Sequence, residues 1–105
     1  MTEYVINLNQ LPNQGFSTNI TDKNGTMYSL DIKLRTLRNG LLIMDLAVDG
    51  IEQFYGRACV NKIPMLWHNK LNGNIYFEDQ YGIEDPEYRG FNDRFLLIYN
   101  DEYVL

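Results

Sequence analysis

The chain has 105 residues, a formal net charge of −5 and a hydrophobic content of 45%. A chain of this length buries roughly two-thirds of its extended surface and is too short for two cores, so we expect one domain over residues 1–105. Nine basic side chains are scattered among fourteen acidic ones, which argues against nucleic-acid binding, and no apolar run approaches the roughly 20 residues that cross a bilayer.

The N-terminal part of the chain predicts two strands separated by a loop. Residues 3–9 alternate, with Tyr4, Ile6 and Leu8 on one face. The segment 11–15, which contains Pro12-Asn13-Gln14, breaks this strand because proline cannot donate to a ladder and Asn and Gly tolerate turn geometry. A short polar strand over 16–20 follows, and its composition suggests the edge of a sheet.

A long hairpin over residues 26–48 is the predicted centre of the fold. Two alternating segments flank Arg38-Asn39-Gly40, and Asn-Gly supplies the positive φ angles of a tight hairpin turn. Both segments place one apolar row on the same face: Tyr28, Leu30, Ile32, Leu34, Leu42, Met44, Leu46 and Val48.

The remaining elements continue this pattern. Asp49-Gly50 predicts a second hairpin into a strand over 51–60, and further strands are expected over 75–78 and 94–100. The last one is apolar on both faces, so we expect it to be covered twice. Residues 79–93 form a long irregular stretch, which in a small domain is usually functional. The predicted fold is all-β, a small antiparallel β-sandwich or barrel of about seven strands, and the sequence does not decide between the two.

The sequence offers little for catalysis. Cys59 has no second cysteine to pair with and is expected to be a small buried hydrophobe. His68 is the single histidine, next to Trp67, and no nucleophile elbow or phosphate loop is present. The carboxylates between Asp79 and Glu87 lack EF-hand spacing and are expected to be solvated. We therefore expect that the chain is not an enzyme and that it binds no metal and no cofactor.

Several short strings, in this order, resemble the small baseplate plug proteins of contractile-tailed bacteriophages. Their order and spacing over nearly the whole chain carry the resemblance, since each alone is weak. The strings are Leu11-Pro12-Asn13-Gln14 with Phe16, Arg35-Thr36, Gly40 leading to Asp45, Val48-Asp49-Gly50, Gly56-Arg57-Ala58-Cys59, Pro64-Met65, Gly73-Asn74-Ile75-Tyr76-Phe77, Asp85-Pro86-Glu87-Tyr88, Phe91 and Leu97-Ile98-Tyr99.

The resemblance implies a structural virion protein at the centre of the tail baseplate, made and assembled in host cytoplasm. It would be present in several copies and would pack against the hub, the spike and the tail-tube initiator. Eight Tyr, five Phe and one Trp suit such interfaces, although small β-domains also fill thin cores with aromatics. The candidate partner-interface residues are Pro12, Asn13, Gln14, Arg57, Trp67, Tyr81, Tyr88 and Phe91.

A second hypothesis comes from a different class of protein. A free-standing β-module could bind a small ligand or carbohydrate by stacking it on Trp67, Tyr81 and Tyr88. Under this hypothesis substitution of the aromatic loop would abolish ligand binding and leave particle assembly intact.

Overall fold

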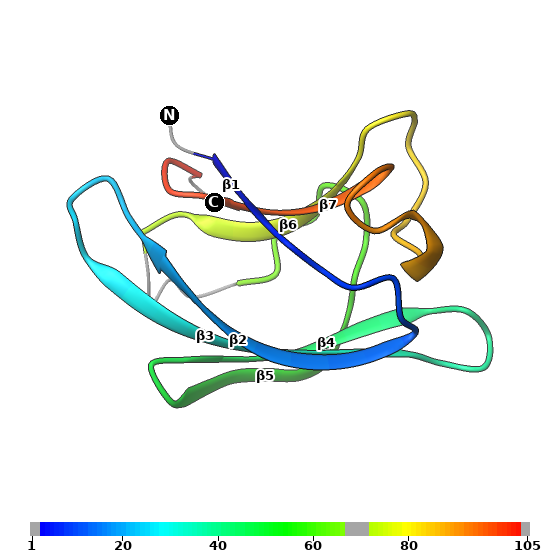
Figure 1. Ribbon diagram of the computed structural model, residues 1–105, viewed down its shortest axis with the longest axis horizontal. Coiled ribbons are helices and arrows are strands. Elements are labelled where there is room, and N and C mark those ends of the chain that lie inside the picture. The colour runs from blue at the N-terminus through cyan, green and yellow to red at the C-terminus, as the bar shows by residue number, and fades with distance from the viewer. Residues whose placement is uncertain (1–2, 67–71, 104–105) are drawn as a thin grey trace.

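The computed structural model describes residues 3–66 and 72–103. These residues form two antiparallel sheets, with strand orders β1-β7-β6 and β2-β3-β4-β5, that pack face to face around one core (Figure 1). The fold is therefore a β-sandwich and not a closed barrel. No helix among the described residues is long and apolar enough to cross a membrane. The elements are β1 (Glu3–Ile6), β2 (Asn13–Thr21), β3 (Met27–Thr36), β4 (Leu42–Val48), β5 (Ile51–Ala58), β6 (Asn74–Asp79), the 3-10 turn η1 (Tyr88–Gly90) and β7 (Phe95–Asn100).

The predicted central hairpin is confirmed as β3 and β4. Its apolar row faces the opposite sheet, and apart from the half-buried Tyr28 every predicted member is buried. The turn is less tight than expected. Leu37 N–H donates to the Leu41 carbonyl and Gly40 N–H donates to the Leu37 carbonyl, each at 2.9 Å, so three residues form the loop. Gly40 alone within this turn has a positive φ, of 87°.

The second hairpin follows the prediction closely. Asp49 and Gly50 have φ angles of 52° and 78°, which is the pair of positive angles that a two-residue turn of type I′ requires. β5 then runs back along β4 with register shifts around Leu46, so the ladder is irregular there. It ends at Ala58, two residues earlier than expected.

The first two strands differ from the predicted boundaries. β1 is shorter than predicted and ends at Ile6, whereas β2 starts at Asn13, inside the segment expected to be a loop. The reason lies in contacts with the end of β3: the Asn13 Oδ1 accepts the Thr36 N–H at 3.2 Å, and the Pro12 carbonyl accepts the Thr36 hydroxyl at 2.8 Å. These bonds extend the ladder to residues whose intrinsic preference is for a turn.

β7 lies between β1 and β6 and has buried residues on both faces, as its sequence predicted. Leu97 and Tyr99 face the core, and Ile98 is buried on the other face. Cys59 is 1% exposed, which confirms its assignment as a buried hydrophobe.

Candidate interaction surfaces

The segment 80–94 connects β6 to β7 and is anchored by an ion pair at its base. Asp79, at the end of β6, has a fully buried side chain, and the Arg94 guanidinium reaches it from the start of β7. The Nε and Nη2 of Arg94 each lie 2.9 Å from one carboxylate oxygen of Asp79. This paired geometry fixes direction as well as distance, so the two ends of the segment are held at a defined spacing.

The same carboxylate also orders the start of the segment. Its oxygens accept the N–H groups of Tyr81 and Glu84, both at 2.9 Å. The Arg94 hydrogen bonds, opposed by burial and helped by these N–H groups, hold the pKa of Asp79 well below its usual value. Asp79 is therefore ionised at neutral pH and acts as the hub of the loop.

Two large side chains point into solvent from this anchored loop. Tyr81 is 69% exposed and Ile83 is 88% exposed. The Tyr81 hydroxyl donates to Asp93 Oδ1 at 2.8 Å, and this bond raises the pKa of the tyrosine while fixing its ring. An apolar surface held in place before binding loses little entropy on binding, so this pair is well suited to contact a partner.

The other two predicted aromatics of the segment lie deeper. Tyr88 begins η1, is half-buried against the core and carries the Arg89 guanidinium 4.9 Å above its ring centre. Phe91 is fully buried and stacks on Phe77 with ring centres 5.8 Å apart. The sequence predicts a partner contact for Phe91, but its ring is part of the core and offers no surface.

The predicted Pro12-Asn13-Gln14 loop uses its polar groups within the chain. The Gln14 side chain donates to the Asn9 carbonyl at 2.6 Å and accepts the Asn9 N–H at 3.0 Å, which closes the connection from β1 to β2. The Asn13 carboxamide oxygen is bonded to Thr36. The oxygen atoms of these two amides thus accept hydrogen bonds from the chain itself and not from a partner. Leu11, Pro12 and Asn13 remain exposed at this loop.

Arg57 also contacts its own chain. Its guanidinium lies 4.5 Å from the centre of the Phe54 ring and donates to the Met65 carbonyl, which ties β5 to the segment that follows it. Burial lowers the pKa of this guanidinium. Trp67 lies outside the described residues, as does His68.

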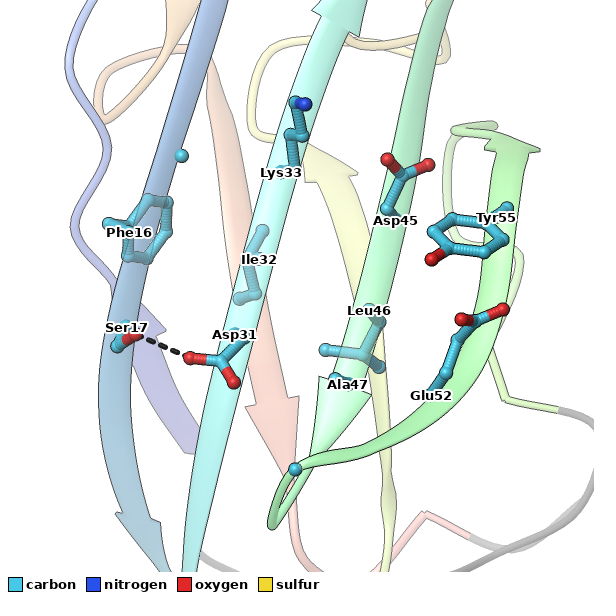
Figure 2. Close-up of a pocket in the computed structure, with 12 residues that line it drawn as sticks. Phe16, Ser17, Asp31, Ile32, Lys33, Asp45, Leu46, Ala47, Glu52 and Tyr55 are labelled. Carbon is cyan, nitrogen blue, oxygen red and sulfur yellow. Dashed lines mark hydrogen bonds between the residues drawn. The ribbon is translucent and has the colours of Figure 1, made fainter.

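The outer face of the four-stranded sheet carries a surface that the sequence had not indicated. Asp31, Lys33, Asp45, Glu52 and Tyr55 are among the residues that line a hollow of about 710 Å³ on β2–β5. Figure 2 shows how these side chains lie on the strands. Ser17 donates to Asp31 on the floor of the hollow. Tyr55 is 70% exposed, and the nearby charges are mostly negative, so this hollow favours a basic or neutral partner.

Asp45 is the most strongly held of these acids. Burial alone would raise its pKa, but hydrogen bonds from the Gly56 N–H at 2.7 Å and the Arg35 guanidinium at 2.8 Å outweigh burial and lower it. A charge already satisfied by two donors is poorly available to a ligand. Among residues 3–66 and 72–103 no group of three or more His, Cys, Asp or Glu side chains is arranged to hold a metal ion.

Sequence reasoning missed two features of the 80–94 loop. Ile83 is an isolated aliphatic residue in an acidic, glycine-containing stretch, and that isolation was the available signal for an exposed anchor. The Asp79–Arg94 pair gave no signal, because the partners are 15 positions apart and meet only when β6 and β7 pair.

The chain was compared with known proteins. Residues 3–102 match the family model described as cyanophage baseplate Pam3 plug gp18. No curated protein matched the chain. The family match covers both sheets of the sandwich and the 80–94 loop, so it applies to the described fold as a whole. The chain belongs to this family of cyanophage baseplate plug proteins.

Proposed function

We propose that this chain is the plug component at the centre of a contractile-tail baseplate, where several copies pack against the hub, the spike and the tail-tube initiator. The observation that carries the proposal is the family match over residues 3–102, which supports a structural role in a phage tail and contact with other baseplate components. Assembly takes place in the host cytoplasm, and the chain acts through contacts and not through catalysis.

We further propose that the 80–94 loop is one of these contacts. Tyr81 and Ile83 supply the apolar area, and the Asp79–Arg94 pair supports them from below. Interface hot spots are typically large side chains presented in a fixed conformation and surrounded by polar groups, which describes this loop. Of the eight contact residues predicted from the sequence, Tyr81 is the exposed anchor in this proposal.

The first experiment counts the chain in purified phage particles by quantitative mass spectrometry against the tail-tube protein. A fixed, low number per tail is expected for a plug. Absence from the particle would contradict the proposal and leave the ligand-binding module as the hypothesis to test.

A second experiment tests the loop. In a phage lacking the wild-type gene, a variant with Tyr81→Ala and Ile83→Ser is expected to fold normally and to enter tails roughly tenfold less often, as loss of a hot spot would cause. The matched control carries Ile51→Ala and Met27→Ser, at positions 55% and 64% exposed on the other sheet and outside the hollow over β2–β5. Normal incorporation of the loop variant would show that this loop is not the contact.

A further inference from the structure

The two sheets have four lateral edges, and they are protected very differently. The outer edge of β6 is covered, because Lys62 N–H donates to the Phe77 carbonyl at 2.7 Å and Met65 N–H donates to the Ile75 carbonyl at 2.8 Å. The outer edge of β5 is interrupted by shifts in register and carries charged residues such as Glu52. β1 is four residues long. These are the usual devices that prevent a sheet from pairing with another chain.

β2 has none of these devices. It is a nine-residue edge strand without a charged residue, a proline or a shift in register, and among the described residues it pairs only with β3. A long, regular and uncharged edge is the form that accepts an additional strand.

The backbone groups that face outward from β2 follow from the hydrogen bonds around it. Asp22 N–H donates to the Thr26 carbonyl at 2.9 Å across the turn between β2 and β3, and the Ser29 carbonyl accepts the Asp49 N–H at 2.8 Å on the β4 side. Because bonded pairs alternate along an antiparallel ladder, the even-numbered residues of β2 bond to β3. The N–H and C=O groups directed to the open edge are therefore those of Gly15, Ser17 and Asn19.

A groove of about 300 Å³ runs between this edge and β1. Its lining is mixed. Tyr4 and Ile6 lie on the core side of β1, paired with the buried Tyr99 and Leu97, and Phe16 lies on the core side of β2, paired with the buried Ile32. Asn7, Ser17, Thr18 and Asn19 add polar surface. Tyr4 is still 44% exposed in this groove. Within residues 3–66 and 72–103, this side of the sandwich thus combines backbone groups that have no strand partner with the partly exposed rings of Tyr4 and Phe16.

We propose that the β2 edge receives an extended segment of a different baseplate chain, which adds to the sheet as a fifth strand and closes the groove. Its inward side chains are apolar and alternate with polar ones, and it carries no excess of acidic residues because this chain has a net charge of −5. The proposal rests on the proposed function only for the source of the segment, and it concerns a surface separate from the 80–94 loop.

A second copy of this chain fits the site less well. Pairing of β2 with β2 would satisfy the backbone, but the inward side chains of the added strand would be those of residues such as Phe16 and Ile20, which already pack into their own core. They cannot also fill the groove of the neighbour. A segment that is not yet part of a folded core meets both requirements.

Proline substitution tests the edge directly. Ser17→Pro removes an outward-facing N–H and places a ring on the open edge, while the bonds from Phe16 and Thr18 to β3 remain. Ser17→Ala is the matched control, since it also loses the hydroxyl bond to Asp31 but keeps the N–H. Incorporation into tails is expected to fall roughly tenfold or more for the proline variant and to stay at the wild-type level for the alanine variant. Equal incorporation of the two would overturn the proposal.

Hydrogen exchange of the wild-type chain gives an answer that does not depend on how a variant folds. In the free chain the amides of Gly15, Ser17 and Asn19 are expected to exchange fast and those of Phe16 and Thr18 slowly. When exchange is carried out in assembled baseplates and read out by single-residue mass spectrometry, the three outward amides are expected to slow by about a hundredfold or more. A chain that is present in the particle with these three amides still fast would overturn strand addition and leave the proposed function standing, whereas its absence from the particle would overturn both.

A photo-crosslinking residue at position 19 identifies the occupant. The expected product joins this chain to a different baseplate protein. A product that joins two copies of this chain would overturn the proposal in favour of self-pairing.

Discussion

Asp79 controls the 80–94 loop through four donors that converge on one buried carboxylate. Its pKa in the folded chain lies below the ordinary value of 3.8. A carboxyl group with a depressed folded pKa contributes stability that is fully present above its unfolded pKa and is lost as the pH falls through the folded pKa. The contribution of Asp79 is thus constant at neutral pH and disappears in acid.

Asp79→Asn is expected to lower the urea midpoint of unfolding at pH 7, because the amide cannot pair with Arg94 as an anion does. The difference from wild type is expected to hold down to about pH 5 and to shrink below it, because the carboxyl of the unfolded wild-type chain then takes up a proton while that of the folded chain stays ionised until the pH reaches its lower pKa. Glu87→Gln is the control in the same loop: its pair with Arg89 is exposed, at 37% and 74%, and its loss is expected to have no measurable effect. A difference that grew in acid would contradict the assignment.

Phe91 and Tyr81 make a second comparison within the loop. Phe91→Ala is expected to destabilise the chain by about 3–5 kcal/mol, since it removes a fully buried ring from its stack with Phe77. Tyr81→Ala removes an exposed ring and is expected to change stability little. Urea unfolding followed by far-UV circular dichroism measures the free energy of unfolding of both variants. If both variants lost a similar amount of unfolding free energy, the assignment of Phe91 as buried and Tyr81 as exposed would be wrong.

At the scale of the elements, Gly73 is the tightest point at the start of β6. It has a φ of +93°, and a Cβ there would press on the Asn100 carbonyl and lie 2.6 Å from the Asp101 Cα. Gly73→Ala is thus expected to destabilise the chain in two ways: the alanine is strained at this positive φ, and its Cβ clashes with the backbone after β7. Gly50, with a φ of +78°, has no atom within 4 Å of such a Cβ. Gly50→Ala is expected to cost about 1–2 kcal/mol, from conformation alone.

The measurement is urea unfolding of both variants. Gly73→Ala is expected to be clearly the less stable of the two, or to fail to fold, while Gly50→Ala folds. Equal losses would mean that the chain end after β7 can move away from β6.

The elements were predictable where the cause was local. Alternation over the central hairpin and the Asp49-Gly50 dipeptide are short-range signals, and both elements formed as predicted. The start of β2 was wrong because its cause is distant: bonds to Thr36 recruit Asn13 into the ladder. The choice of a sandwich over a barrel likewise depends on strand pairing between distant parts of the chain. β1 and β2 pair in different sheets, and no local pattern encodes this.

The interaction surfaces were less predictable for the same reason. The sequence predicted contact residues in the 79–93 segment, and of these Tyr81 is exposed, whereas Phe91 has the same composition signal and lies in the core. Whether an aromatic in an irregular segment points inward depends on the strand that it meets, here β6 with Phe77. The uncharged edge of β2 was visible as composition, yet its openness follows only from the strand order.

At the scale of the whole molecule, Cys59 reports on global unfolding. It belongs to the core cluster that both sheets share, and burial raises the pKa of its thiol to about 12. The thiolate is the reactive form, so the folded chain offers almost none of it at pH 8. We expect the thiol to be labelled by a disulfide reagent only through opening of the sandwich, at a rate that rises with urea in parallel with the unfolded fraction measured by circular dichroism. Fast labelling without urea would show that the core opens locally at the end of β5, and in that case the two sheets would not unfold as one cooperative unit.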